Sequence, residues 1–382
     1  MKHTKMITLL SLLVVFLWSA SCSLPKTDSG VVDTAAVAAN VPDPIGNALQ
    51  AAQEPAVQTP EPTVLPEEKA TAAPTAESIL QTEPDGKGIV QFTVVLHLEG
   101  WDDGEKEISF RKHAEQLRAY AALFERYGAK MTLESKEIID GCINWEDNVL
   151  LELSERGHAV GIHADAGGEP GASVRSIAKT LNEMREKLSS LGIETNFASG
   201  TASKANWVKA CKQGGIDTVS CMVAYGLWSL NPSLRPDGFE PYQNPSDGHA
   251  PYPFALEDRV QPWLMADGSN WIVPDPDGTV LLIPSGLSLN GASEELNGER
   301  VHESELTQAD IDAWREVLPR VIAASDSKGV NTFYAVWSFG KALDMDLLEE
   351  WLRLINEYVQ AGSIRWSTIP QMAEFYRNSP ER

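Results

Sequence analysis

From residue 89 to its end, the chain alternates short apolar runs with amphipathic stretches, and this alternation limits the possible folds more than any other feature. The short runs are rich in β-branched and aromatic residues, and the longer stretches carry apolar residues at helical spacing. Strands that are joined through helices run parallel, so the pattern favours an α/β fold in which helices cover a parallel sheet. The seven or eight repeats indicate a (β/α) barrel, distorted or incomplete, rather than an open sheet.

The individual elements follow from the same patterns. The predicted strands are Phe92–Leu98, Lys130–Leu133, Ala159–His163, Thr195–Ala198, Thr218–Val223, Val280–Pro284, Thr332–Trp337 and Ile364–Trp366. The predicted helices are Arg111–Tyr127, Trp145–Arg156, Val174–Leu191, Lys204–Gln213, Gln308–Ala324 and Met345–Gln360. Residues 225–278 are rich in Pro, Trp and Asp and lack helical spacing, which predicts a long irregular insertion over one face of the barrel.

The first 88 residues have a different composition. Residues 1–21 contain basic residues, an apolar run and then small residues, which is the order of a secretory signal peptide. Cys22 follows directly and resembles the lipidated cysteine of bacterial lipoproteins; cleaved secretion and a retained anchor are the alternatives. Residues 22–88 are rich in Pro, Ala, Thr and Glu and predict a disordered tether. We expect an exported protein of the cell envelope, lipid-anchored to the outer side of a bacterial membrane, with one folded domain over 89–378.

Charge narrows the range of partners. The chain has 54 acidic and 31 basic residues, which gives a formal net charge of −23. A charge of this sign repels nucleic acid and anionic lipid headgroups. We therefore expect no nucleic-acid partner, a membrane contact only through the N-terminal lipid, and a glycan or another small neutral or basic molecule as substrate.

Apart from Cys22, the chain has three cysteines, Cys142, Cys211 and Cys221. At most one disulfide can form among them. Their spacing matches no zinc motif, and we expect buried, inert thiols.

Polar side chains gather where the first predicted strand ends. In a β/α barrel the active site lies at the carboxyl ends of the strands. The two-residue repeat of a strand puts His97 and Glu99 on one face, and Asp102 and Asp103 follow in the loop.

The third predicted strand ends in the same way, with His163 and Asp165 side by side. Imidazole and carboxylate groups from neighbouring strands are suitable ligands for a divalent metal of the zinc type. A further carboxylate nearby could act as a base toward a metal-bound water.

These residues lie in segments that resemble a known family. Gly157–His163 resembles the Gly-His-Glu-Ile-Gly-x-His motif of polysaccharide deacetylases, which belong to the glycoside hydrolase/deacetylase superfamily of β/α barrels. Val94–Trp101 resembles the first-strand motif of a branch that ends Asp-Val-Glu-Asp-Trp, and Gly362–Ile369 resembles the last strand and its following helix. The resemblance spans roughly residues 89–376, and it implies that His163 binds metal, that Glu99 is the catalytic base and that His158 is structural.

The metal motifs are incomplete. Gly100 stands where the family has a metal-binding Asp, and Gly167 stands where a second His follows. The site either recruits other ligands for a divalent metal such as zinc or no longer binds one. The catalytic candidates are Glu99 and Asp103, and the candidate metal ligands are His163, His97, Asp165 and Asp102.

Aromatic and histidine side chains near the strand ends and in the insertion suit stacking against sugar rings. An aromatic residue in a long loop can equally pack the loop onto the domain. The candidate substrate-binding residues are Trp101, His249, Tyr252, Trp263 and Trp271.

Three functions remain open at this point. The first is hydrolysis of an N-acetyl or related amide or ester group on a glycan, in which Glu99 takes a proton from the attacking water. The second is a carbohydrate-binding module of the same fold without turnover. The third is a metal-free glycosidase with paired carboxylates such as Glu99 and Asp165.

Overall fold

The computed structural model describes residues 87–202, 204–221, 224–236, 254–284, 286–299, 301, 305–338 and 343–380. The chain divides into two units, Met1–Ala70 and Thr71–Arg382, and all of the described residues belong to the second. The predicted signal peptide and Cys22 lie outside the described residues. Lys87 and Gly88, which the sequence assigns to the tether, already contact the domain: Lys87 Nζ donates to the Ala323 carbonyl at 2.8 Å, and Gly88 N to Ser325 Oγ at 3.1 Å.

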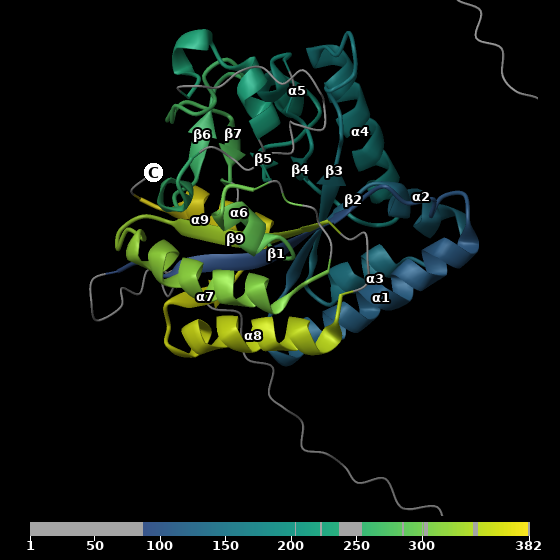
Figure 1. Ribbon diagram of the computed structural model, residues 1–382. Coiled ribbons are helices and arrows are strands. Elements are labelled where there is room, and N and C mark those ends of the chain that lie inside the picture. Colours follow the sequence, from purple (N-terminus) through teal and green to yellow (C-terminus); the bar gives the residue numbers. More distant parts are fainter. Residues whose placement is uncertain are drawn as a thin grey trace, which may run out of the picture. The chain divides into compact units, whose positions relative to one another are not determined.

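Ten strands form one sheet among the described residues. They are β1 (Val90–Leu98), β2 (Met131–Ser135), β3 (Ala159–His163), β4 (Phe197–Ser199), β5 (Thr218–Val219), β6 (Trp263–Met265), β7 (Val280–Leu282), β8 (Leu287–Ser288), β9 (Asn331–Ser338) and β10 (Ile364–Trp366). The order is β6-β7-β5-β4-β3-β2-β1-β9-β8, and β10 pairs with β1. Every pairing is parallel except that of β6 with β7 (Figure 1).

The sheet curves into a barrel whose hydrogen-bonded ladder does not close, because β7 and β8 are not paired. The Tyr334 hydroxyl spans this part of the barrel: it accepts from Cys221 N at 2.8 Å and donates to the Ile283 carbonyl at 3.4 Å. Val95 and Phe197 belong to the apolar cluster around Tyr334. The predicted α/β fold, a distorted (β/α) barrel, is confirmed.

Helices follow most strands. They are α1 (Glu107–Arg126), α2 (Glu137–Asn144), α3 (Val149–Glu155), α4 (Val174–Ser190), α5 (Trp207–Gln213), α6 (Ala292–Leu296), α7 (Gln308–Ala323), α8 (Met345–Gln360) and α9 (Ile369–Asn378). Figure 1 shows α7 and α8 side by side next to β1 and β9. Ring contacts hold this layer together, since Trp314 of α7 lies 5.6 Å from Trp351 of α8 and 5.9 Å from Phe92 of β1.

Local capping explains where several helices begin. Ser173 and Ser176 form a capping box at α4, and Thr307 and Asp310 form another at α7. The predicted helix over 145–156 is shorter and begins later, because Glu146 has a positive φ of 53° and the Asn148 side chain caps α3. None of the helices in the described part of the chain is both long and apolar enough to span a bilayer.

The predicted insertion is largely irregular where it is described. It contains the 3-10 turns η2 (Ala224–Ser229), η3 (Pro232–Leu234) and η5 (Leu256–Arg259), but it also contributes β6, which was not predicted. Arg259 is buried and ties this segment to the domain through the Gly286 carbonyl at 3.0 Å and Glu295 at 3.3 Å. The insertion is therefore packed onto the barrel along this part of its length.

Candidate functional site

The structure brings together three side chains that the sequence selected. His97 and Glu99 extend from the carboxyl end of β1, and His163 ends β3. Glu99 Oε2 lies 3.0 Å from His163 Nε2, and Glu99 Oε1 lies 4.0 Å from His97 Nδ1. The two imidazole rings are 4.3 Å apart between centroids. One possible ligand atom from each residue lies within 4.8 Å of the others, at the carboxyl-terminal mouth of the barrel.

Each imidazole contacts a second polar side chain through the ring nitrogen that does not face Glu99. His163 Nδ1 is 2.8 Å from Ser199 Oγ at the end of β4. His97 Nε2 is 3.1 Å from Glu134 Oε2 of β2, and this carboxylate is fully buried. With their outer nitrogens occupied, both rings turn the other nitrogen toward Glu99. Metal-binding histidines are commonly oriented in this way by an outer hydrogen-bonding partner.

The group is strongly coupled electrostatically. Burial alone would raise the pKa of Glu99, but the contact with His163 and the charges of His163, His97 and Lys136 bring that pKa down to about 2. Burial opposes the charged form of His97, yet its contacts with Cys221 and Glu134 raise the pKa of His97 well above its usual value. Burial likewise opposes ionisation of Glu134, and its contact with His97 lowers the pKa of Glu134. Glu99 and Glu134 are thus both carboxylates at neutral pH.

Tight backbone packing places the end of β3. Gly200 has a φ of +65°, and a Cβ on it would lie 2.7 Å from Asp165 N and 3.2 Å from His163 Nε2. A side chain at this position would therefore strain the backbone and push against the imidazole. Asp165 also has a positive φ, of 45°, which turns the chain away at this point.

Asp165 does not join the three-residue group. Its side chain is 61% exposed and pairs with Lys136 Nζ at 2.9 Å. Lys136 also contacts Glu137 at 3.3 Å. Asp165 thus forms a charged rim with Lys136 and Glu137 outside the three-residue group.

The loop after β1 places Asp102 and Asp103 elsewhere. Glu105 N donates to the Asp102 carbonyl at 2.9 Å, so the chain turns immediately into α1. The Asp102 carboxylate pairs with Lys106, whereas the fully buried Asp103 contacts His113 Nδ1 at 2.7 Å. Neither carboxylate belongs to a group of possible metal ligands among the described residues. The structure thus offers no support for Asp103 as a catalytic residue or Asp102 as a ligand.

The predicted substrate-binding aromatics have different surroundings. Trp271 is fully buried, donates from Nε1 to the Gly226 carbonyl at 2.9 Å and packs edge-on against Trp207 at 5.9 Å. Trp263 Nε1 donates to the Trp271 carbonyl at 2.7 Å, and Trp101 stacks on His113 at 3.9 Å.

The buried ring of Trp271 therefore packs the insertion onto the domain and cannot stack on a sugar in this conformation. His249 and Tyr252 lie outside the described residues.

Sequence reasoning missed two residues of this region, Glu134 and Cys221. The predicted second strand stopped at Leu133, but β2 continues to Ser135, and the alternation from Thr132 puts Glu134 on the inner face. The available signal was the position of Glu134, which follows the buried Thr132 by two residues and therefore lies on the same face of the strand. Cys221 follows β5 and has a φ of 52°, which no sequence pattern indicates. Cys142, Cys211 and Cys221 are all free thiols.

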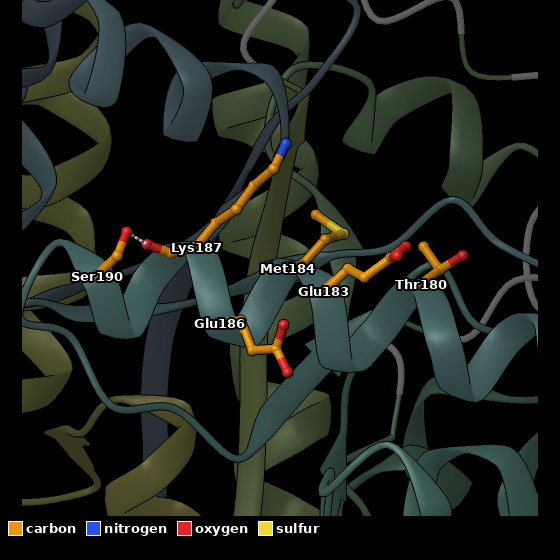
Figure 2. A pocket seen from close by; sticks show the side chains of 6 residues that line it. All are labelled: Thr180, Glu183, Met184, Glu186, Lys187 and Ser190. Carbon is orange, nitrogen blue, oxygen red and sulfur yellow. Dashed lines mark hydrogen bonds between the residues drawn. The ribbon is translucent and has the colours of Figure 1, made fainter.

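A separate surface hollow lies along the outer side of α4. It is lined by Thr180, Glu183, Met184, Glu186, Lys187 and Ser190 (Figure 2). All of these residues belong to one helix, and none of them belongs to the group at the barrel mouth. We assign no function to this hollow.

The side chains at the mouth are of the types that bind a divalent metal. Two imidazoles and a carboxylate form a ligand set that binds zinc in known proteins. His97 and His163 present nitrogens to the same carboxylate, and each is oriented through its other nitrogen. His97, Glu99 and His163 are thus the residues that would hold such an ion. Of the predicted ligands, His163 and His97 belong to this group, and its third member is Glu99, which was predicted as a base.

Comparison with known proteins supports the architecture. No protein-family model matches the chain, and no curated protein matches its sequence. Among solved structures, Puue allantoinase is similar with a TM-score of 0.50 and 11% sequence identity, over 84% of this chain and 100% of that one. A putative polysaccharide deacetylase from Mycobacterium smegmatis has a TM-score of 0.45 and 15% identity, over 81% of this chain and 95% of that one.

A 4-alpha-glucanotransferase from Thermococcus litoralis has a TM-score of 0.44 and 14% identity, over 75% of this chain and 40% of that one. The chain therefore spans less than half the length of the glucanotransferase. At these identities the likeness is one of fold. The chain has a distorted β/α-barrel fold of the kind found in Puue allantoinase.

Proposed function

We propose that this chain is a metal-dependent hydrolase of the deacetylase type, acting on an acylated glycan. One observation carries the proposal: His97, Glu99 and His163 place their donor atoms within 4.8 Å of one another at the mouth of the barrel. This is the end of the strands at which β/α-barrel enzymes carry their active sites. The motif resemblance around His163 supports the same reading.

The roles of the side chains follow from their contacts. A bound divalent ion of the zinc type supplies a Lewis acid that polarises a carbonyl and acidifies water. Ser199 holds His163, and Glu134 holds His97, so that both rings keep their orientation. Glu99 is ionised at neutral pH because its pKa is about 2. We assign it two tasks: it would help to hold the ion, and it accepts the proton of the attacking water.

The substrate and location rest on sequence features. A net charge of −23 favours a neutral or basic substrate, and an N-acetylated glycan is of this class. The N-terminal segment supports export with lipid attachment at Cys22. Metabolic labelling with a fatty acid tests the attachment: the full chain takes up label, and Cys22→Ser abolishes it. Equal labelling of the two would contradict lipidation at Cys22.

Metal analysis combined with acetate release tests the enzymatic proposal. We expect the purified chain to bind one zinc, cobalt or nickel ion and to release acetate from N-acetylated oligosaccharides. Glu99→Gln removes a charged donor and is expected to abolish acetate release. Glu186→Gln is the matched control, because that carboxylate lies on the outer side of α4 and contacts Asn182.

Two results would replace the proposal. A metal-free chain that binds oligosaccharides without releasing acetate would be a binding module of this fold. Metal-independent production of new reducing ends would identify a glycosidase, and the two carboxylates responsible would then have to be sought anew, because Asp165 faces Lys136.

A further inference from the structure

A second group of possible metal ligands lies behind His97, on the inner side of the barrel. It consists of His97 from β1, Glu134 from β2 and Cys221 after β5, whose ligand atoms lie within 4.8 Å of one another. Cys221 is held in place by its backbone, because its N–H donates to the Tyr334 hydroxyl at 2.8 Å. Its φ of 52° is rare for a residue with a side chain, so the fold constrains this position.

Two buried atoms of this group face each other without a regular hydrogen bond. His97 Nε2 and Glu134 Oε2 form an ion pair, and neither makes a hydrogen bond of regular geometry in the described part of the chain. Buried polar atoms normally have such a bond. The other oxygen, Glu134 Oε1, does accept a hydrogen bond, from Ser220 Oγ. The oxygen without a regular hydrogen bond is thus the one that faces His97.

The spacing of the two atoms agrees with shared coordination. They lie 3.1 Å apart. With ordinary zinc–nitrogen and zinc–oxygen bond lengths, two ligand atoms on one tetrahedral ion lie roughly 3.3 Å apart. A slight widening of the gap between them would let both atoms bind one ion, and Cys221 would add a sulfur.

We propose that His97, Glu134 and Cys221 form a second metal-binding group, which takes a thiophilic divalent ion such as cadmium or zinc. The sulfur distinguishes it from the group at the mouth, since thiolate ligands favour softer ions. On binding, the Cys221 thiol loses its proton to the solvent and a sulfur–metal bond forms. This group shares His97 with the group at the mouth, but its binding of an ion does not require the proposed hydrolysis.

The two groups share His97 and are alternatives. To bind an ion, His97 must give up one of its two ring protons, and the neutral imidazole then offers one lone pair. His97 Nδ1 faces Glu99, whereas Nε2 faces Glu134. The tautomer of His97 therefore decides which group can bind an ion, and a soft ion in the inner group competes with an ion at the mouth.

Cadmium binding tests the inner group directly. All variants carry Cys22→Ser, so that no thiol from the N-terminal segment contributes, and Glu99→Ala disables the group at the mouth. We expect this chain to show a sulfur-to-cadmium charge-transfer absorption that saturates at one ion per chain. Adding Cys221→Ser should remove the absorption and weaken cadmium binding by tenfold or more. Cys211→Ser is the matched control, as Cys211 is a buried thiol on α5, and it should keep the absorption.

A second measurement covers the case in which Cys221→Ser does not fold. In the chain with Cys22→Ser alone, cadmium should slow alkylation of Cys221 tenfold or more, as followed by mass spectrometry, without slowing alkylation of Cys142. Absence of the charge-transfer absorption in the Glu99→Ala chain, or equal alkylation of Cys221 with and without cadmium, overturns the inference. Acetate release by the unmodified chain is scored separately, so failure of the hydrolase proposal and failure of this one are distinguishable.

Discussion

The two histidines at the two ends of β3 have opposite surroundings. His158 lies just before the strand, where its Nδ1 accepts from Met131 N at 2.9 Å and its Nε2 lies 3.2 Å from Glu125. His163 lies at the other end, where Glu99 and Ser199 contact its two nitrogens. His158 thus joins the backbone of β2 to the surface of α1, whereas His163 faces other ionisable groups across the barrel mouth.

This contrast shows what separates a structural end of the barrel from a functional one. Around His158, the charged groups are neutralised by surface cations: Glu125 is 2.9 Å from Arg156 and 3.2 Å from Lys130. At the mouth, buried imidazoles and carboxylates are opposite one another. Perturbed groups that converge in this way are a known mark of functional sites.

The largest expected effect comes from replacing each histidine in turn. We expect His163→Ala to lower the affinity for zinc by more than about 100-fold, since loss of an outer partner alone typically costs 10- to 100-fold. His158→Ala should leave the affinity unchanged and lower the free energy of unfolding instead. Isothermal calorimetry and denaturant unfolding measure the two quantities. A reversed pattern would mean that the ends have been assigned the wrong way round.

The second comparison concerns the carboxylates that contact the histidines at the two ends of the barrel, Glu134 beside His97 at the mouth and Glu125 beside His158 at the opposite end. Glu134→Ala leaves the buried His97 without its anionic partner and is expected to cost about 3 to 5 kcal/mol of unfolding free energy. Glu125→Ala removes a carboxylate that is partly exposed to solvent, and we expect about 1 kcal/mol or less. Chemical denaturation of both variants at pH 7 checks this ratio. If both variants lose the same unfolding free energy, burial of the pair formed by His97 and Glu134 contributes less to stability than we expect.

The third prediction concerns acid stability. Burial, opposed by Glu125, lowers the pKa of His158 to about 4, below its usual value of 6.5. Between these values the unfolded chain binds more protons, so stability is fully present above about pH 6.5 and is lost as the pH falls toward 4. The expected loss from this residue is on the order of 2 to 3 kcal/mol.

Unfolding free energies measured from pH 7 to pH 4.5 test this point. His158→Asn keeps an acceptor for Met131 N but does not titrate. Between pH 7 and pH 4.5 its unfolding free energy should therefore fall by about 2 to 3 kcal/mol less than that of the unmodified chain. If the two slopes are the same, His158 does not control acid stability.

The smallest effect is expected at Ser199. Ser199→Ala removes the hydroxyl that orients His163, and we expect zinc affinity to fall by about tenfold with little change in stability. Ser176→Ala, in the exposed capping box of α4, is a control for removing a serine hydroxyl elsewhere. Unchanged affinity in Ser199→Ala would show that His163 keeps its orientation through packing alone.

The sequence predicted much of the fold because strand and helix patterns are local. The spans of β3, β10 and α8 agree with the prediction residue for residue. The short strands β6 and β8 were missed, since two or three residues carry too little pattern to be recognised. Gly157–His163 was informative because its histidines fall at both ends of one strand.

Within the site, the sequence determined which strand ends carry ionisable side chains, and hence His97, Glu99 and His163. Only the tertiary structure decided that Glu134 and Cys221 lie behind His97, that Asp103 belongs with α1, and that Trp271 is buried. The physical reason is that side-chain alternation follows from the chain itself, whereas meeting across the barrel depends on strand register and on the course of each loop. Contacts between residues far apart in sequence are therefore set by how the strands and loops pack, which local patterns do not encode.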